Sequence, residues 1–261
     1  MPTPKKMAKL SVVIVAKNES ANIYDCVKSA AFADEILVID SGSTDQTIRL
    51  AKNAGARILK KKWIGYGPQQ NIAINASKGD WVFSLDADER ISSKLAKEII
   101  RSIKEEEFYV YNVPRKSLFV SRFMGHSGWR PDYTKRLFKK GFAKFTEHEV
   151  HAHLSTKYKI GKLANPIIHF SYRDLESVIY KMNLYSTGGA RDNLKSGKKG
   201  SLRKAIFHGL WAFFRTYFIR AGFLDGREGV MLAIANAEVT YYRYLKLYYI
   251  SQKNLKSKIH F

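Results

Sequence analysis

The stretch WVFSLDADER, Trp81–Arg90, decides how the first half of this 261-residue chain is interpreted. It begins as an apolar run typical of a buried strand, and it ends in Asp86, Asp88 and two further charges. Burying a charge costs free energy unless the charge is paired, so this strand end calls for a specific partner. On an extended strand, residues i and i+2 point to the same side. The two carboxylates would therefore repel one another unless a cation lay between them.

Strand-like and helix-like segments alternate along the chain up to and beyond this stretch. Apolar runs rich in β-branched residues predict strands, and segments with helical spacing of apolar residues lie between them. The predicted strands cover residues 10–17, 35–43, 56–63 and 80–89, and the predicted helices cover residues 19–33, 43–55, 67–79 and 91–103. Repeats of this length indicate a parallel sheet with helices on both faces. Further strands are expected over 108–120 and 135–145, and helices from residue 171 onward.

Polar residues follow three of the predicted strands, at the edge where ligands bind in such sheets. They are Ala16 to Glu19 after the first strand, Asp40 and Ser41 after the second, and Asp86 and Asp88 after the fourth. A single Asp at a strand end is usually a turn former, but convergence from three strands favours a ligand site. Carboxylate oxygens suit Mg²⁺ or Mn²⁺, and Mg²⁺ is commonly held by one or two carboxylates plus substrate phosphates. A diphosphate ligand would complete this site.

Several segments together resemble the family 2 glycosyltransferases, which have the GT-A fold. They are LSVVIVAKNES (10–20), EILVIDSGSTDQT (35–47), GPQQNIAINASKGDWVFSLDADE (67–89) and GWRPDYTKRLFKKG (128–141). Two later segments, GKLANPIIHFSYRD (161–174) and FFRTYFIRAGFLDGREGVMLAIANAE (213–238), are similar to a narrower branch, the lipopolysaccharide core glycosyltransferases of the WaaE/KdtX type. The fold class implied is α/β: a Rossmann-like, mostly parallel GT-A sheet flanked by helices, with a helical, basic and aromatic C-terminal extension.

The resemblance implies two domains and roles for individual residues. Residues 1–170 would bind the nucleotide sugar and catalyse transfer, and residues 171–261 would associate with a membrane or the acceptor. The residues implied to line the donor site are Ala16, Asn18, Glu19, Asp40, Ser41, Gln69, Gln70, Asn71 and Asp86. Asp88, together with Asp86, would bind the metal. Trp129, Arg130 and Arg136 would lie near the diphosphate and the acceptor.

The resemblance also implies an inverting mechanism, in which a general base takes the proton of the attacking acceptor hydroxyl. The base is expected within FTEHEVHAHL (145–154), where this chain has Ala152 after His151 and relatives often have Glu. Glu149 is the favoured base, and Glu147 and His151 are the alternatives. His148, His151 and His153 also suit diphosphate contacts or a metal, although no cysteine completes a zinc set. A polar exposed strand is the plainer interpretation.

The second half of the chain is strongly basic. Residues 111–261 hold 28 Lys and Arg against 9 Asp and Glu, whereas residues 1–110 hold 17 against 14. Such an excess favours an anionic partner: nucleic acid, a phosphorylated glycolipid or an acidic membrane surface. The basic segment 195–204 fits a mobile loop or a lipid-phosphate contact.

A helical stripe of large apolar residues lies within this basic half. Its members are Phe207, Leu210, Trp211, Phe214 and Phe218, and they are flanked by Arg203, Lys204, Arg215 and Arg220. This pattern is typical of a helix lying in a membrane interface. Charges interrupt each apolar run well before the roughly 18–20 residues that a span needs, so we expect the protein to rest on a membrane without crossing it. The alternative is that the stripe packs on the catalytic domain or on a second subunit of a homo-oligomer.

The leading hypothesis is an inverting hexosyltransferase that depends on Mg²⁺ or Mn²⁺. It would move glucose from a UDP-sugar to an anionic lipid-linked saccharide, the inner core of lipopolysaccharide. The nearest alternative acceptor is a polyprenyl phosphate or another envelope glycan. A nucleic-acid-binding protein is disfavoured, because carboxylates at three strand ends would repel phosphates. A non-catalytic membrane scaffold is a further alternative, which Ala152 leaves open.

The cellular location is expected to be the cytoplasm, at the cytoplasmic face of the inner membrane. The single cysteine, Cys26, has no intramolecular disulfide partner and fits a reducing compartment. The N-terminal segment has basic residues but lacks the apolar run of a secretory signal.

Overall fold

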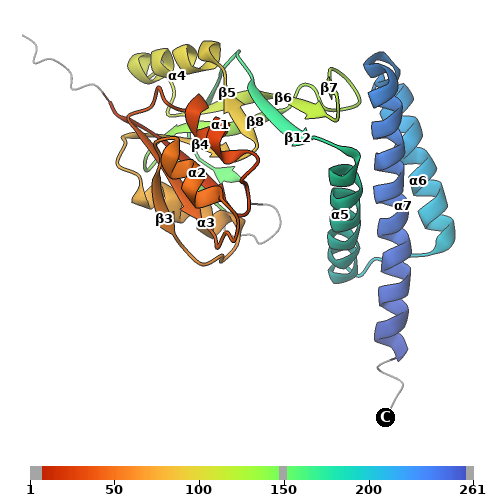
Figure 1. Ribbon diagram of the computed structural model, residues 1–261. Helices are drawn as coiled ribbons and strands as arrows, with labels where there is room; N and C mark the ends of the chain where they lie inside the picture. The colour runs from red at the N-terminus through yellow and green to blue at the C-terminus, as the bar shows by residue number, and fades with distance from the viewer. Residues whose placement is uncertain (1–7, 147–151, 257–261) are drawn as a thin grey trace, which may run out of the picture. The chain divides into compact units, whose positions relative to one another are not determined.

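Strand β1 (Leu10–Ala16) lies at the centre of a sheet in the computed structural model, which describes residues 8–146 and 152–256. Six of its seven residues are buried, which is the pattern of a parallel strand covered on both faces. The chain forms two compact units (Figure 1). The first contains the described residues of 1–116 and 132–169, and the second those of 117–131 and 170–261.

The order of elements follows the alternation expected up to α4 and then changes. The strands are β1, β2 (Glu35–Asp40), β3 (Arg57–Lys60), β4 (Trp81–Asp86), β5 (Glu89–Ile91), β6 (Val110–Phe119), β7 (Arg122–Phe123), β8 (Tyr133–Lys139), β9 (Lys144–Phe145), β10 (Leu154–Ser155), β11 (Ile160–Lys162) and β12 (Ile167–Tyr172). The helices are α1 (Ile23–Ser29), α2 (Thr47–Asn53), α3 (Tyr66–Ala76), α4 (Ser93–Glu105), α5 (Leu175–Lys195), α6 (Leu202–Phe214), η1 (Arg215–Ile219), η2 (Gly222–Asp225) and α7 (Gly226–Lys256).

The sheet of the first unit has a parallel half and an antiparallel half. β3, β2, β1 and β4 lie side by side in that order and are parallel to their neighbours. β8 then pairs antiparallel with β4, and β6 pairs antiparallel with β8. The predicted α/β architecture, a GT-A-like sheet flanked by helices, is confirmed. The antiparallel position of β8 beside β4 was not predicted, and it brings Arg136 close to the end of β4.

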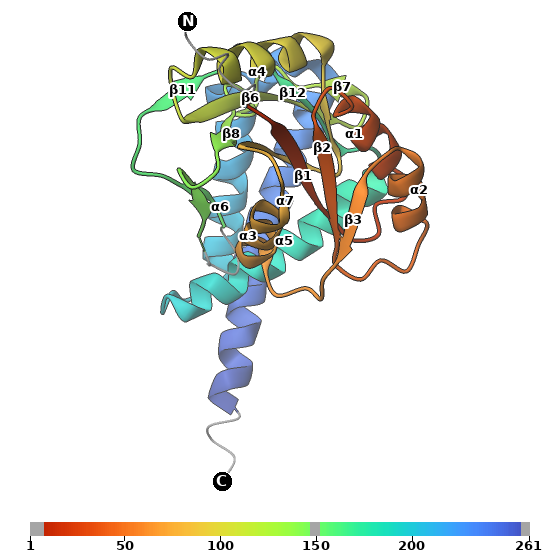
Figure 2. The ribbon, with the colours of Figure 1, turned by 90° about the vertical axis from the view of Figure 1, so that its left-hand side faces the viewer.

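Helices cover both faces of this sheet, and each face has its own apolar core (Figure 2). On one face, α1, α2 and α4 contribute side chains such as Ile23, Ala51 and Leu95. On the other, α3 packs Ala73 and Ile74 against the sheet. α1 is shorter than the predicted helix 19–33, because the residues before it form a turn in which the N–H groups of Asn22 and Ile23 donate to the carbonyl of Glu19.

The second unit is built on helix α7, against which both α5 and α6 pack. Its apolar core joins the tip of β6 to the helices through Phe119, Met124, Val178 and Leu232. Helix α5 begins with a capping box, in which Asp174 accepts from the Ser177 N–H at 2.7 Å. The helical C-terminal extension is therefore confirmed. No helix in the part of the chain that the structure describes combines the length and the apolar character that a membrane span requires.

Asp225 fixes the loop that follows β7 within this second unit. Its side chain is 1% exposed and accepts from the Gly125 N–H at 2.9 Å, the His126 N–H at 3.0 Å and the Ser127 hydroxyl at 2.8 Å. A carboxylate with several donors is well satisfied when buried, and the loop in turn has its backbone donors paired.

Replacing Asp225 with Ala should destabilise the second unit by roughly 2–3 kcal/mol, because several donors lose a charged acceptor. The free energy of unfolding from urea titrations, followed by circular dichroism, measures this effect. The control is Glu228→Ala, which removes a 2.7 Å contact with the Ser121 hydroxyl at an exposed position and should change stability far less. Equal effects of the two substitutions would contradict the role given to Asp225.

Candidate active site

The carboxyl ends of β1, β2 and β4 meet at one edge of the sheet, as the sequence predicts. The register pairs Ala16 with Asp40 across β1 and β2, and Val15 with Asp86 across β1 and β4. Parallel neighbours end on the same side, so the polar residues that follow these strands gather there. The candidate donor site starts from this edge.

The loop after β2 is held by side chains that the sequence assigned to the nucleoside. Asp40 is 2% exposed and accepts from the N–H groups of Gly42 at 3.1 Å and Ser43 at 3.3 Å. Asn18, which has a positive φ of 55°, accepts from the Thr44 N–H at 2.8 Å and so ties the end of β1 to this loop. Glu19 accepts from the Asn22 amide at 2.7 Å. These contacts give the three residues a structural role at the rim of the site.

The side chains of α3 also contact neighbouring segments of the protein. Gln69 is fully buried and donates to the Ser41 hydroxyl at 3.0 Å, while its own Oε1 has no partner among the described residues. Gln70 accepts from the Ser84 hydroxyl at 3.2 Å. Asn71 donates to the Phe145 carbonyl and accepts from the Phe145 N–H, each at 2.9 Å. Helix α3 therefore links the β2 loop and β4 to β9.

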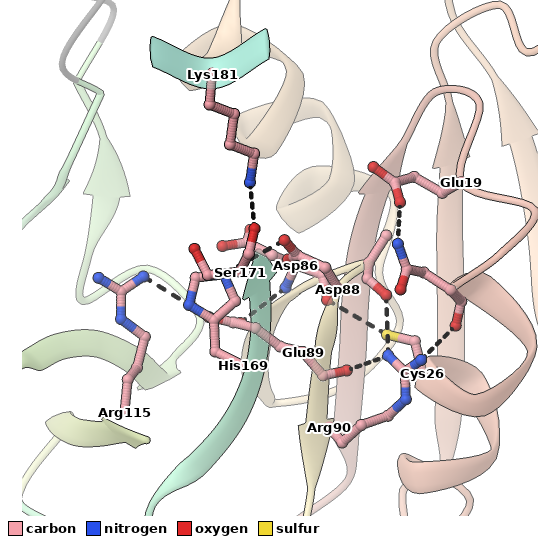
Figure 3. A network of polar contacts seen from close by, with 12 residues as sticks. Glu19, Cys26, Asp86, Asp88, Glu89, Arg90, Arg115, His169, Ser171 and Lys181 are labelled. Carbon is pink, nitrogen blue, oxygen red and sulfur yellow. Dashed lines mark hydrogen bonds and ion pairs between the residues drawn. The ribbon is translucent and has the colours of Figure 1, made fainter. Parts of the chain in front are cut away.

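The acidic pair departs from the geometry that the sequence predicted. Asp86 and Asp88 were expected on one extended strand, with both side chains on the same face. Instead β4 ends at Asp86, a turn covers residues 87–88, and β5 begins at Glu89. The two carboxylates consequently have different partners. Asp86 forms an ion pair with Arg136. The Asp88 Oδ2 lies 3.3 Å from the His169 Nε2, and Figure 3 shows both of these residues.

Arg136 joins the buried carboxylate of Glu89 to the partly exposed carboxylate of Asp86. It is 6% exposed; its Nη1 donates to Asp86 at 3.3 Å, its Nη2 also contacts Asp86, and the same Nη2 donates to Glu89 at 2.9 Å. Burial would lower the pKa of Arg136, but the charges of Asp86 and Glu89 raise it. Desolvation by the surrounding protein would raise the pKa of Asp86, but the charge of Arg136 has the larger effect and holds the pKa of Asp86 below its ordinary value. The guanidinium and Asp86 therefore stay charged.

Glu89 is the residue of this cluster that the sequence analysis did not assign. Its side chain is fully buried, and it accepts from the backbone N–H of Asp86 at 3.0 Å as well as from Arg136. Burial raises the pKa of Glu89. The negative charge of Asp86 raises it further, and the positive charge of Arg136 lowers it by less than burial raises it. The signal was present in the sequence: a third acidic residue directly after Asp88, followed by the apolar Ile91 of a buried segment.

Two further residues position the turn that carries Asp88. Arg90 donates to the carbonyls of Ala87 at 3.1 Å and of Asn22 at 2.9 Å, so it fastens the turn to the start of α1. His169, on β12, faces Asp88 and was missed because it lies 81 positions away in sequence. The one hint in the sequence was a histidine within GKLANPIIHFSYRD, a segment that the sequence analysis used only for its family resemblance.

The predicted base candidates Glu147, Glu149 and His151 lie outside the described residues, as does His148. The described residues on either side of that segment are held together. β9 pairs with β10, and the Thr146 N–H donates to the His153 carbonyl at 3.0 Å. Gly67 of α3 lies so close to Thr146 that a Cβ there would be 1.8 Å from its carbonyl oxygen.

Trp129 and Arg130, which the resemblance placed near the diphosphate, belong to the second unit. The Trp129 ring lies edge-on to Phe119, with ring centroids 5.9 Å apart, and at the same centroid distance from Tyr172. It therefore contributes to the core of that unit. Arg130 is exposed.

Replacing Arg136 with Met should lower the free energy of unfolding by about 3–5 kcal/mol, because buried Glu89 loses the guanidinium that donates to it at 2.9 Å and keeps only Arg115, 3.8 Å away. Urea titrations of the purified protein measure this effect. Adding Glu89→Gln to Arg136→Met should restore part of the loss, since the second change removes the buried charge that Arg115 alone compensates only weakly.

The control for this prediction is Arg101→Met, which breaks an exposed ion pair with Glu105, one turn further along α4, at 3.7 Å. Exposed pairs contribute at most about 1 kcal/mol, so this variant should unfold close to the wild type. An Arg136→Met protein as stable as Arg101→Met would refute the structural role of the cluster.

Comparison with known proteins gives the family. A family model described as glycosyl transferase family 2 matches residues 11–158. A Rickettsia bellii protein described as an uncharacterized glycosyltransferase is 33% identical over 92% of this chain and 86% of its own length. The lipopolysaccharide core biosynthesis glycosyltransferase LpsC of Rhizobium meliloti is 28% identical over 90% of this chain and 93% of its own. The crystal structure of S. aureus TarS 1-349 has 16% identity and a TM-score of 0.48, covering 94% of this chain and 92% of that one. On the family model and the extent of the Rickettsia match, this chain belongs to glycosyl transferase family 2.

Proposed function

We propose that the chain is a metal-dependent, inverting transferase that moves glucose from UDP-glucose to an anionic lipid-linked saccharide, the inner core of lipopolysaccharide. The observation that carries the proposal is the acidic turn at the end of β4. It presents Asp88 beside His169 at the sheet edge where Ala16 and Asp40 also lie, in a chain of this family. The likeness to LpsC over 90% of the chain supports the choice of acceptor.

The donor atoms at this turn suit a divalent cation in part. Asp88 offers carboxylate oxygens and His169 an imidazole nitrogen, and their 3.3 Å separation lets both turn toward one ion. Within residues 8–146 and 152–256, no group of three or more His, Cys, Asp and Glu side chains could hold a metal. Asp88 and His169 would therefore hold Mg²⁺ or Mn²⁺ together with the diphosphate of the donor. Once bound, the ion would supply positive charge where the leaving diphosphate gains negative charge.

Asp86 has a different part in this proposal. The sequence analysis assigned it to the metal as well as to the donor, but in this structure Arg136 binds its carboxylate. Asp86 would contact the donor sugar or ribose from a position that Arg136 and Glu89 fix. The nucleoside would lie along Ala16–Glu19 and Asp40–Ser41, whose loop contacts keep the rim of the site in shape.

The acceptor side of the reaction needs a base and a direction of attack. We assign the base to Glu149, with Glu147 and His151 as alternatives, on the family resemblance. The base would take the hydroxyl proton of the acceptor as the oxygen attacks the anomeric carbon from the face opposite the diphosphate. We place the reaction at the cytoplasmic face of the inner membrane.

Replacing Asp88 with Asn should lower sugar transfer by roughly 100-fold or more. It should also raise the Mn²⁺ concentration for half-maximal activity by roughly 10- to 100-fold, because the amide is a poorer ligand. His169→Ala should shift the same Mn²⁺ dependence. The measurement is UDP release from UDP-glucose with lipopolysaccharide core acceptor across a Mn²⁺ titration, with folding checked by circular dichroism.

The matched control is Asp80→Asn, the same change at the other end of β4, where Asp80 is exposed and accepts from the Lys9 N–H at 2.9 Å. It should leave transfer unchanged. Full activity of Asp88→Asn at low Mn²⁺ would refute the metal assignment. A donor and acceptor screen on the wild type would refute the substrates instead, if another sugar nucleotide or a polyprenyl phosphate were preferred.

A further inference from the structure

Helix α6 of the second unit carries its large apolar residues on the outside. Phe207 and Leu210 are each 68% exposed, Trp211 48%, Phe214 47% and Phe218, on η1, 52%. The opposite side of the same helix is made of small residues, and it is buried: Ala205, Gly209, Ala212 and, on η1, Thr216. In helices that pack on a protein core, the large apolar residues face the core and the polar ones face water. Here the arrangement is reversed.

Close packing of α6 on α7 explains why the small residues face inward. A Cβ on Gly209 would lie 3.3 Å from the Tyr241 Cβ and 3.4 Å from the Ala237 carbonyl, so even a methyl group would be tightly packed between the two helices. The backbones come together along this line and leave no room for the aromatic rings. The outward stripe is therefore a consequence of how the helix pair is built, since rotating α6 would drive Phe207 or Trp211 into α7.

The exposed side chains form a continuous ridge. The Trp211 and Phe214 rings stack with their centroids 5.9 Å apart, and the Phe214 and Phe218 centroids are 5.1 Å apart. Ile219 at the end of η1 and Phe223 and Leu224 on η2 are also each more than half exposed. A contiguous apolar surface of this kind marks an interaction site in a folded protein. We call it the α6–η1 face.

The segment that carries the α6–η1 face is rich in positive charge. Residues 193–224 contain seven Lys and Arg and no Asp or Glu. Arg203, Lys204 and Arg215 are exposed on α6 and at the start of η1. An apolar aromatic ridge with cationic side chains at its margins matches a bilayer of anionic lipids, which offers acyl chains below a layer of negative headgroups. A second copy of the chain would bring like charges together in a twofold contact, which opposes self-association.

We propose that the α6–η1 face docks onto an anionic lipid bilayer, with Phe207, Leu210, Trp211, Phe214 and Phe218 inserted between the headgroups and Arg203, Lys204 and Arg215 at the lipid phosphates. This inference names the surface through which the proposed enzyme would meet its lipid-linked acceptor, yet its argument uses only the second unit. Lipid binding and sugar transfer can fail independently, so separate measurements distinguish them.

Vesicle co-sedimentation of the full chain tests the proposal, without donor or acceptor present. The wild type should bind phosphatidylcholine vesicles that contain phosphatidylglycerol and bind pure phosphatidylcholine much less. The double variant Trp211→Ser/Phe214→Ser should bind the anionic vesicles about tenfold more weakly or less. The matched control is Trp63→Ser/Tyr66→Ser, two aromatics of the first unit that are 38% and 63% exposed, and it should bind like the wild type.

Two further variants separate insertion from charge attraction. Trp211→Phe should bind like the wild type but lose the quenching of tryptophan fluorescence by brominated lipids, which reports that this ring enters the bilayer. Arg203→Gln/Lys204→Gln/Arg215→Gln should weaken binding to anionic vesicles and make it less sensitive to salt. Both should keep the circular dichroism of the wild type, since all these side chains are exposed.

Several outcomes would overturn the proposal. One is a wild type that stays in solution with anionic vesicles at low salt, and another is a Trp211→Ser/Phe214→Ser protein that binds them normally. A dimer in sedimentation velocity that dissociates in the same double variant would assign the face to a second copy of the chain. Loss of vesicle binding with unchanged transfer to a soluble acceptor would support the face and leave the proposed reaction intact.

Discussion

The buried guanidinium of Arg136 holds the acidic turn of the candidate site in place. It pairs with Asp86 at the end of β4 and with Glu89 at the start of β5, and Glu89 in turn accepts from the backbone N–H of Asp86. Without a cation between them, these carboxylates would repel one another, and this repulsion would destabilise the turn at residues 87–88. Because β8 supplies the arginine from an antiparallel position beside β4, the geometry of the site depends on the second half of the sheet.

In this cluster the two aspartates have different partners and therefore different roles. Asp86 is committed to its ion pair with Arg136 although its side chain is 42% exposed, whereas Asp88, 25% exposed, extends from the turn toward His169. A similar commitment holds elsewhere at the rim, where Asp40 and Asn18 organise the loop after β2 and Asn71 anchors Phe145. Side chains that a family motif assigns to substrate thus spend much of their hydrogen-bonding capacity on shaping the site. Such preorganisation lets the remaining groups meet a ligand without first being ordered.

The second unit follows a different packing rule from the first. In the first unit, large apolar residues fill the space between sheet and helices on both faces. In the second, α6 meets α7 through small residues, and its aromatic side chains point outward among arginines and lysines. The free energy that drives burial of those rings is therefore not recovered within the unit, which is why the surface calls for an apolar and anionic partner.

The sequence by itself determined the α/β class, the order of the first elements, the meeting of three strand ends and the helical C-terminal extension. These features follow from local periodicity and from the parallel direction of neighbouring strands, both of which short segments encode.

The prediction that Asp86 and Asp88 lie on one extended strand was wrong. A strand predicted from its apolar residues carries no information on where contacts with distant segments end it. Only the tertiary structure brought Arg136 to Glu89 and His169 to Asp88, since the long-range pairing of β8 with β4 and of β12 with β5 leaves no local pattern. The tertiary structure also decided that the aromatic stripe of α6 faces outward. The stripe by itself is compatible with either a buried or an exposed face. The small residues on the opposite side of α6 determine the outcome, because they let α7 pack closely against that side.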